Sequence, residues 1–209
     1  MSGDAIYTHQ SIAKSIADHE VQKIFGLLGD ANLFLVDYYV RSCAGNFVPA
    51  AHENGAVLMA LAYSYFSGKV GIASVTHGPG LTNCLTALTE GARGRIPMVL
   101  LAGDTPLTAR NHLQNIDQHA VTNITGAGFE QLRDPENASL DFARAFLRAN
   151  TERRPIVLNI PADFMWKKSA HKKTILPLIS SQKVVLEGVQ HEIAIGILAS
   201  ARRPLILGG

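Results

Sequence analysis

The chain has 209 residues, 47% of them apolar and 7% aromatic, which is typical of a soluble α/β protein with a substantial core. Its net charge at pH 7 is +2 and its lysines and arginines are scattered, so the basic surface that nucleic acid or an anionic membrane would require is missing. Two isolated cysteines exclude a disulfide framework, and the lack of a signal peptide or a long apolar run predicts a cytoplasmic protein.

Short apolar runs alternate with amphipathic segments up to residue 160. The apolar runs predict buried strands over residues 24–28, 47–51, 70–75, 98–102 and 156–160. Apolar stripes at helical spacing predict helices over residues 8–21, 33–40, 55–66 and 81–93, and another that follows Asp134. Gly68 stands where a left-handed residue ends the third helix. This alternation predicts a doubly wound α/β fold, with a mainly parallel sheet and helices on both faces.

Two stretches break the alternation. Residues 104–125 lack a regular period, and so long an irregular stretch in a compact domain is more often functional than idle. From residue 167 to about 183 the chain is polar and carries a group of lysines, which predicts a solvated linker. Residues 187–200 then resemble a helix, and residues 202–209 resemble a strand that runs into a glycine turn. We therefore expect a second domain that begins here and is cut off.

Glu53 is the most informative residue, because it lies between an apolar strand and the start of a helix. A lone glutamate at this position is most often a surface group that the helix dipole stabilises. Apolar neighbours on both sides, such as Ala51 and Val57, instead predict a tightly packed junction that keeps water from the carboxyl group. The next strand runs into a second junction at residues 74–83, with the sequence SVTHGPGLTN. Because open α/β sheets bind ligands at the carboxyl ends of their strands, we expect a cofactor pocket here.

The second junction permits other interpretations. Gly78, Gly80 and Asp104 are spaced as in a dinucleotide-binding loop with a ribose-binding acid, but the third glycine is missing and Pro79 removes an N–H from the phosphate cradle. The turn can also be one that needs glycine dihedrals and binds nothing. The histidines lack metal-ligand spacing, so we expect no metal site, and the lack of a Gly-x-Ser-x-Gly elbow argues against a hydrolase.

Five blocks of sequence, in this order, resemble the pyrimidine-binding amino-terminal (PYR) domain of thiamine-diphosphate enzymes of the acetolactate synthase and pyruvate decarboxylase type. The blocks are IFGLLGD at 24–30, AHENG at 51–55, VTHGPGLTN at 75–83, IPMVLLAG at 96–103 and RPIVLNIP at 154–161, with Gln114 between the last two. The resemblance runs from about residue 4 to residue 165.

This resemblance implies that the domain grips the aminopyrimidine ring of thiamine diphosphate. Glu53 would bond to the N1′ atom and stabilise the imino tautomer, whose nitrogen removes the C2 proton of the thiazolium ring. The implied activity is that of a 2-oxo acid decarboxylase or carboligase, a lyase or transferase, with acetolactate-synthase-like chemistry preferred. The alternatives are a decarboxylase of the same family that makes no acetolactate, a nucleotide-binding oxidoreductase, and a non-catalytic interaction domain.

The resemblance also implies roles for single residues. Gln114 is similar to a glutamine that faces substrate in the synthases, and Asp30 to an aspartate of the decarboxylases, so both join Glu53 as implied catalytic residues. The implied cofactor-binding residues lie in or after the strand ends, and they are Glu53, Thr76, Pro79, Asn83 and Leu28. Asp30 and Asn83 can equally be caps, and Gln114 a loop amide. Leu28 stands where the family has proline and His77 where the synthases carry serine, which leaves the substrate less determined than the cofactor.

The resemblance further implies groups that this chain does not supply. In the family, a separate domain holds the diphosphate and Mg²⁺, and the cofactor lies between the PYR domain of one subunit and that domain of another. We therefore expect a homodimer or homotetramer, a small 2-oxo acid as substrate, and no activity from this chain alone; whether FAD binds stays open. The expected domains are residues 1–165 as the PYR domain, 166–186 as a linker, and 187–209 as the start of a truncated central domain.

Overall fold

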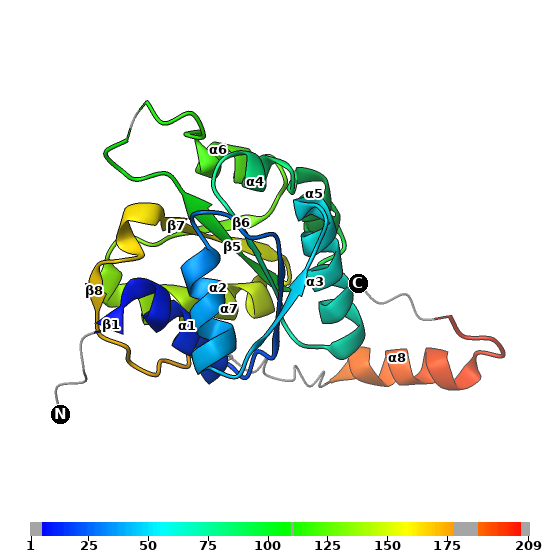
Figure 1. Cartoon of the computed structure of the whole chain (residues 1–209). Helices are drawn as coiled ribbons and strands as arrows, with labels where there is room; N and C mark the ends of the chain where they lie inside the picture. Colours follow the sequence, from blue (N-terminus) through cyan, green and yellow to red (C-terminus); the bar gives the residue numbers. More distant parts are fainter. Residues whose placement is uncertain (1–5, 110, 178–187, 206–209) are drawn as a thin grey trace. The chain divides into compact units, whose positions relative to one another are not determined.

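The larger part of the chain folds around one parallel sheet. In the computed structural model the chain divides into two units, Met1–Leu178 and Ile179–Gly209, and the structure describes residues 6–109, 111–177 and 188–205. The first unit contains a six-stranded sheet with helices on both faces (Figure 1). The predicted doubly wound α/β fold is therefore confirmed.

The six strands of the main sheet are all parallel and follow the order β3-β2-β4-β5-β7-β6. Their bounds are β2 (Lys23–Gly26), β3 (Asn46–Pro49), β4 (Gly71–Val75), β5 (Met98–Asp104), β6 (Gly128–Gln131) and β7 (Pro155–Pro161). A separate antiparallel pair joins β1 (Ile6–Tyr7) to β8 (Lys168–Ser169).

Two helical layers cover the sheet. One contains α1 (Thr8–Asp18), α2 (Leu33–Ser42) and α7 (Ala138–Glu152), and the other contains α3 (Glu53–Ser67) and α5 (Leu85–Arg93). Short helical turns complete the unit: α4 (Pro79–Thr82), α6 (Gln118–Asn123), Pro135–Asn137 and Ala162–Phe164. Each layer buries its own apolar cluster against one face of the sheet.

The central strand β5 shows why the apolar runs form this sheet. Successive side chains of a strand point to opposite faces, and the residues of β5 divide in that way: Val99 and Leu101 pack in the cluster under α1, α2 and α7, whereas Met98 and Leu100 pack under α3 and α5. A strand that is covered on both faces must be apolar throughout. Such strands were predictable because they leave a continuous apolar run in the sequence.

Several predictions about elements need correction. The third helix begins at Glu53 and not at residue 55, and the predicted helix 81–93 is two helices, α4 and α5. The edge strand β6 was not predicted, because it pairs on one side only and carries the polar residues Glu130 and Gln131. The stretch 104–125, predicted to be irregular, contains α6, and the predicted linker 166–186 contains the strand β8.

The second unit contains α8 (Val189–Ser200), in agreement with the helix predicted over residues 187–200. Residues 201–205 form no strand, and the rest of the strand predicted over 202–209 lies outside the described residues. The domain boundaries at 165 and 186 remain a prediction. Within the described ranges, no helix combines the length and the apolar character that crossing a membrane requires.

Candidate cofactor site

The predicted site residues gather at one edge of the sheet. Chain segments leave the carboxyl ends of β3, β2, β4 and β5 side by side in the strand order, at the edge that carries α4 and α6 in Figure 1. Glu53 follows β3, Leu28 and Asp30 follow β2, and residues 76–83 follow β4. Parallel strands present their carboxyl ends together, and such an edge is where open α/β folds bind ligands.

Glu53 is the first residue of α3 and is half-buried. Its Oε2 atom accepts a hydrogen bond of 3.0 Å from the side-chain amide of Asn83, which lies directly after α4. The carboxylate also lies at a helix N-terminus, where the unpaired N–H groups favour a negative charge. The structure thus brings together two of the predicted residues, one from each junction.

The junction around Glu53 is packed on one side only. Val57 is fully buried, but Ala51 is exposed and the Leu58 side chain is 44% exposed. The expectation of a tightly packed junction on both sides was therefore wrong for the chain by itself. The physical reason is that α3 packs on the sheet through one face only. The opposite face of α3 is therefore open at the N-terminal end of the helix.

The turn after β4 requires glycine at one position. Gly78 has φ +57° and ψ −108°, and a Cβ atom at this residue would overlap the carbonyl oxygen of Gln114. Its N–H donates a hydrogen bond of 3.1 Å to the side chain of Gln118 in α6. Pro79 then begins α4 at the position where a missing N–H is tolerated. The expected need for glycine dihedrals is confirmed at Gly78, and the backbone of Gln114 lies against the turn.

Thr76 links the turns that follow β2 and β4. A Cβ atom at Gly29 would lie 2.7 Å from Thr76 Cβ, so the two backbones approach closely. The Oγ1 atom of Thr76 is enclosed and has no hydrogen-bond partner within the described ranges. Asn32 holds the β2 turn by accepting from the N–H of Gly29 at 2.8 Å and donating to Ser74 Oγ at 3.0 Å. A buried hydroxyl without a partner is uncommon and lowers the stability of the fold.

Leu28 and Asp30 lie in the same β2 turn, with their side chains exposed. Asp30 lies near enough to His77 for its charge to raise the pKa of that imidazole, although burial of His77 outweighs the effect and lowers the pKa. Asp30 therefore lies on the His77 side of the edge.

A buried amide network beside this edge was missed in the sequence. Gln118 donates to the carbonyl oxygen of Gly103 at 2.8 Å and also bonds to Asn159 Oδ1. Asn159 in turn donates to Asp104 at 2.7 Å and to Gln131 at 2.8 Å. One signal pointed to it, because Asn159 is a polar residue inside an otherwise apolar strand. The network ties α6 and the loop before it to β5, β6 and β7.

The burial of His77 was also not predicted from the sequence. Its side chain is 5% exposed, and its ring centroid lies 5.4 Å from that of His112. Burial lowers the pKa of His77, and the neighbouring His112 lowers it further. The imidazole is therefore neutral at physiological pH.

The residues at this edge fit an aminopyrimidine better than a metal. The Glu53 carboxylate can accept from the N–H groups of a heterocycle. Among the described residues, no group of three His, Cys, Asp or Glu side chains is placed to hold a metal ion. Asp104, the one acid on β5, is engaged by Thr105 N and Asn159.

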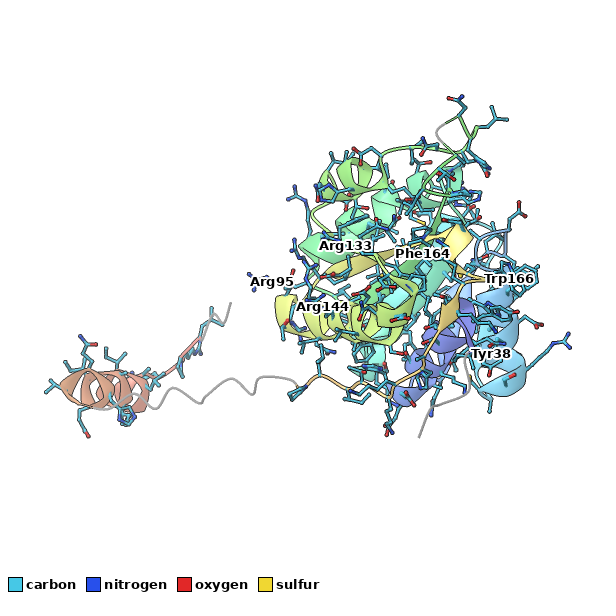
Figure 2. All side chains as sticks on the ribbon, turned by 90° about the vertical axis from the view of Figure 1, so that its left-hand side faces the viewer. Tyr38, Arg95, Arg133, Arg144, Phe164 and Trp166 are labelled. Atoms are coloured by element: carbon cyan, nitrogen blue, oxygen red, sulfur yellow. The ribbon has the colours of Figure 1, made fainter. Side chains whose placement is uncertain are left out.

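A polar cavity elsewhere on the first unit is a weaker candidate for a ligand site than this edge of the sheet. A polar cavity of about 700 Å³ lies beside β6 and α7, with Arg133, Arg144 and Arg148 in its lining. Two of these arginines already pair with acids of the same lining, Arg148 with Glu130 at 2.8 Å and Arg144 with Asp141 at 3.7 Å. Figure 2 shows Arg133 and Arg144 beside α7, on the side away from the aromatic residues Tyr38 and Trp166. The charges of Arg144 and Arg148 are therefore compensated within the chain.

Comparison with known proteins shows the family of the domain. The model for the N-terminal TPP binding domain of thiamine pyrophosphate enzymes matches residues 7–121, which include every predicted site residue. The acetolactate synthase large subunit of Buchnera aphidicola subsp. Schizaphis graminum is 28% identical over 214 residues, with 96% of this chain and 36% of the relative covered.

Two further relatives also align with 96% of this chain. The acetolactate synthase of Mycobacterium leprae is 31% identical over 207 residues, which span 96% of this chain and 33% of the relative. The sulfoacetaldehyde acetyltransferase of Castellaniella defragrans is 27% identical over 217 residues, again 96% of this chain and 33% of the relative. The chain thus spans about a third of the length of these curated relatives.

Proposed function

The chain belongs to the thiamine pyrophosphate enzymes, whose N-terminal TPP binding domain it contains, and from that membership we propose that Glu53 activates the cofactor for acetolactate-synthase-like chemistry on a 2-oxo acid. The observation that carries this proposal is the contact of Glu53 with Asn83 at the carboxyl edge of the sheet. Bound thiamine diphosphate would supply the electron sink that decarboxylation requires.

The arrangement of Glu53 suits the proposed role, which is to hold a proton at the N1′ nitrogen. The hydrogen bond from Asn83 orients Oε2, which leaves Oε1 to face the pyrimidine. A carboxylate that is held in one orientation loses less conformational entropy when it binds the ring than a free carboxylate does. Its open side would be covered by the cofactor and by the diphosphate domain of a second subunit, and this would exclude water from the proton transfer.

The other predicted residues would act around this contact. Thr76, Pro79 and Leu28 would shape the pyrimidine pocket, since they lie in the turns after β4 and β2. Gln114 and Asp30 would face the substrate, because Gln114 lies against Gly78 and Asp30 lies near His77. The diphosphate and Mg²⁺ would be held by another domain in a homodimer or homotetramer, and flavin binding stays open.

The identity of the substrate is left to experiment. Relatives named acetolactate synthase and sulfoacetaldehyde acetyltransferase match this chain at 28% and 27% identity. These values do not separate the two activities. We retain as the alternative an enzyme of the same family that uses its cofactor on a substrate other than a precursor of acetolactate.

The substitution Glu53→Gln tests the proposed role. In the enzyme that contains this chain, exchange of the C2 proton of bound cofactor, followed by NMR in deuterium oxide, should slow by about a hundredfold or more, because the amide cannot hold the N1′ proton as the carboxylate does. The control is Glu90→Gln, an exposed glutamate on α5, which should exchange as the wild type does. Exchange at the wild-type rate in Glu53→Gln would refute the role.

A further inference from the structure

The first turn of α5 receives its cap from another helix. Ala87 is the third residue of α5, so its N–H group has no partner inside the helix. Cys84 stands at the N-cap, but its thiol donates to the carbonyl oxygen of Gly80 at 3.2 Å and caps no N–H group within the described ranges. The side chain of Asn54 provides the cap instead, because its Oδ1 atom accepts from Ala87 N at 3.0 Å.

Asn54 belongs to the first turn of α3 and follows Glu53 directly. Its own N–H donates to Nδ1 of His52 at 3.2 Å, and His52 is the N-cap residue of α3. Asn54 is half-buried, so water reaches its bond with Ala87 only in part. The backbone of Asn54 is therefore held by the start of its own helix, and its side chain is held by the start of α5.

Two hydrogen bonds join the starts of α3 and α5. The side chain of Asn83 donates to Glu53 Oε2 at 3.0 Å, and the backbone of Ala87 donates to Asn54 Oδ1 at 3.0 Å. The two acceptors are neighbours in the chain, and the two donors are four residues apart. Both bonds thus connect the same short segments, residues 53–54 and residues 83–87.

The two bonds differ in how well they withstand water. The bond between Glu53 and Asn83 joins two side chains in an exposed place, where water replaces either partner at little cost. The bond between Asn54 and Ala87 is partly buried and satisfies a backbone N–H at a helix N-terminus, a group that is unfavourable to leave unpaired. The cap therefore sets the spacing of the two segments, and the contact of Glu53 with Asn83 depends on that spacing.

Further along, close packing fixes the same two helices. A Cβ atom at Gly91 in α5 would lie 2.6 Å from Leu61 Cδ2 in α3, so the helices touch there with no room for a larger residue. Leu61, Ala87 and Leu88 belong to one buried apolar cluster. A bond at the helix starts and a contact farther on hold α3 and α5 at one angle. The place of Glu53 relative to α5 is fixed with it.

We propose that Asn54 is a positioning residue for the reaction: by capping α5 it holds the Glu53 carboxylate in the orientation that meets the N1′ nitrogen. The inference rests on the proposed function for the role of Glu53, and Asn54 acts through that residue and not by contact with the reacting atoms. A displacement of about 1 Å in a reacting group is enough to slow a reaction severely. Loss of the cap should therefore slow the proton transfer more than it weakens cofactor binding.

The geometric part of the proposal is tested in the 209-residue chain without cofactor. In NMR spectra, the side-chain amide protons of Asn83 report its bond with Glu53, and Glu53→Ala gives their position when the carboxylate is absent. Asn54→Ala should move the Asn83 signals toward that position. Asn54→Asp keeps an acceptor oxygen for Ala87 N and should leave the signals near those of the wild type. Wild-type Asn83 signals in Asn54→Ala would overturn the proposal.

The functional part is tested in the enzyme that contains this chain, saturated with cofactor. Asn54→Ala should slow exchange of the C2 proton by about tenfold or more, with a smaller change in the affinity for cofactor. Asn54→Asp should restore most of the rate, because aspartate is as good a cap as asparagine. Exchange that is equally slow in both variants would show that the acceptor oxygen is not what matters. If Asn54→Ala does not fold, Asn54→Ser carries the test, because its shorter side chain ends farther from Ala87.

A cap elsewhere separates positioning from stability. Asp134 accepts from the N–H of Glu136 at 3.0 Å, at the start of the helical turn before α7. Asp134→Ala removes a side-chain cap and should lower the melting temperature as Asn54→Ala does, while C2 exchange and the Asn83 signals stay as in the wild type. Equal slowing of exchange in the two variants would assign the effect to lost stability and remove the positioning role.

The outcomes distinguish this inference from the proposed function. If Glu53→Gln exchanges the C2 proton at the wild-type rate, the proposed function is wrong and the positioning role is wrong with it. If Glu53→Gln is slow but Asn54→Ala exchanges at the wild-type rate, only the positioning role is wrong.

Discussion

The two halves of the carboxyl edge differ in how fully their polar groups are paired. Over β5 and β7, Gln118, Asn159 and Asp104 bond to one another inside the protein. Over β2 and β4, Thr76 Oγ1 and His77 Nδ1 are enclosed without partners within the described ranges. The first half is a fully bonded scaffold, whereas the second keeps buried polar atoms that its own packing does not satisfy.

This difference indicates where stability and function are separated in the domain. A fully bonded buried network holds its members in one arrangement and is expensive to disrupt. Unpaired groups lower stability and are rare in proteins unless a ligand or water uses them. Substitutions in the first half should therefore affect folding, and those in the second should affect binding.

The largest effect should come from Asn159→Ala in the network. The change leaves Gln118, Asp104 and Gln131 with unpaired groups in a buried place, and the free energy of unfolding should fall by about 3 to 4 kcal/mol. Urea denaturation of the chain measures it. Asn83→Ala, an exposed asparagine at the same edge, should change stability by no more than about 0.5 kcal/mol. Equal losses in the two variants would remove the distinction between the halves.

A smaller effect should come from Gly78→Ala, at the boundary between the halves. Alanine would need positive φ and would collide with the Gln114 carbonyl, so the unfolding free energy should fall by about 2 to 3 kcal/mol. Gly68→Ala is the matched control, because Gly68 has φ +70° but open space around it, and it should lose about 1 kcal/mol. If both variants lose the same amount, contact with the loop does not restrict Gly78.

The smallest effect on stability should come from Thr76→Val in the second half. Valine has nearly the same shape and removes an unpaired hydroxyl, so the free energy of unfolding should stay the same or rise by up to about 1 kcal/mol. Thermal unfolding of the chain measures this. In the enzyme, the same variant should weaken cofactor binding if the hydroxyl serves a ligand. A loss of stability in the chain would show that Thr76 Oγ1 has a structural partner.

The sheet and its main helices were predictable because their signals are local. Strands β4, β5 and β7 are buried on both faces and leave continuous apolar runs, and α3 ends at Gly68 with the left-handed dihedrals that glycine favours. The edge strand β6 was not predictable, since it is polar and gains its conformation by pairing with β7. A strand of this kind is stabilised by its neighbour and not by its own residues.

The site shows the same division. Glu53 and the Gly78 turn could be selected from the chain, because a carboxylate and a glycine turn at strand ends have a recognisable context. The bond between Glu53 and Asn83 joins residues 30 positions apart, and the contact between His77 and His112 joins two loops. No spacing along the chain indicates such pairs.

What the sequence determined by itself was the class of fold and the family, because hydrophobic periodicity and turn chemistry are properties of neighbouring positions. The tertiary structure alone decided which polar groups found partners. Hydrogen bonding in a buried place depends on geometry between distant segments, and only the folded chain provides that geometry. For this reason Gln118 and Asn159 became scaffold, whereas Thr76 Oγ1 and His77 Nδ1 have no partner within the described ranges.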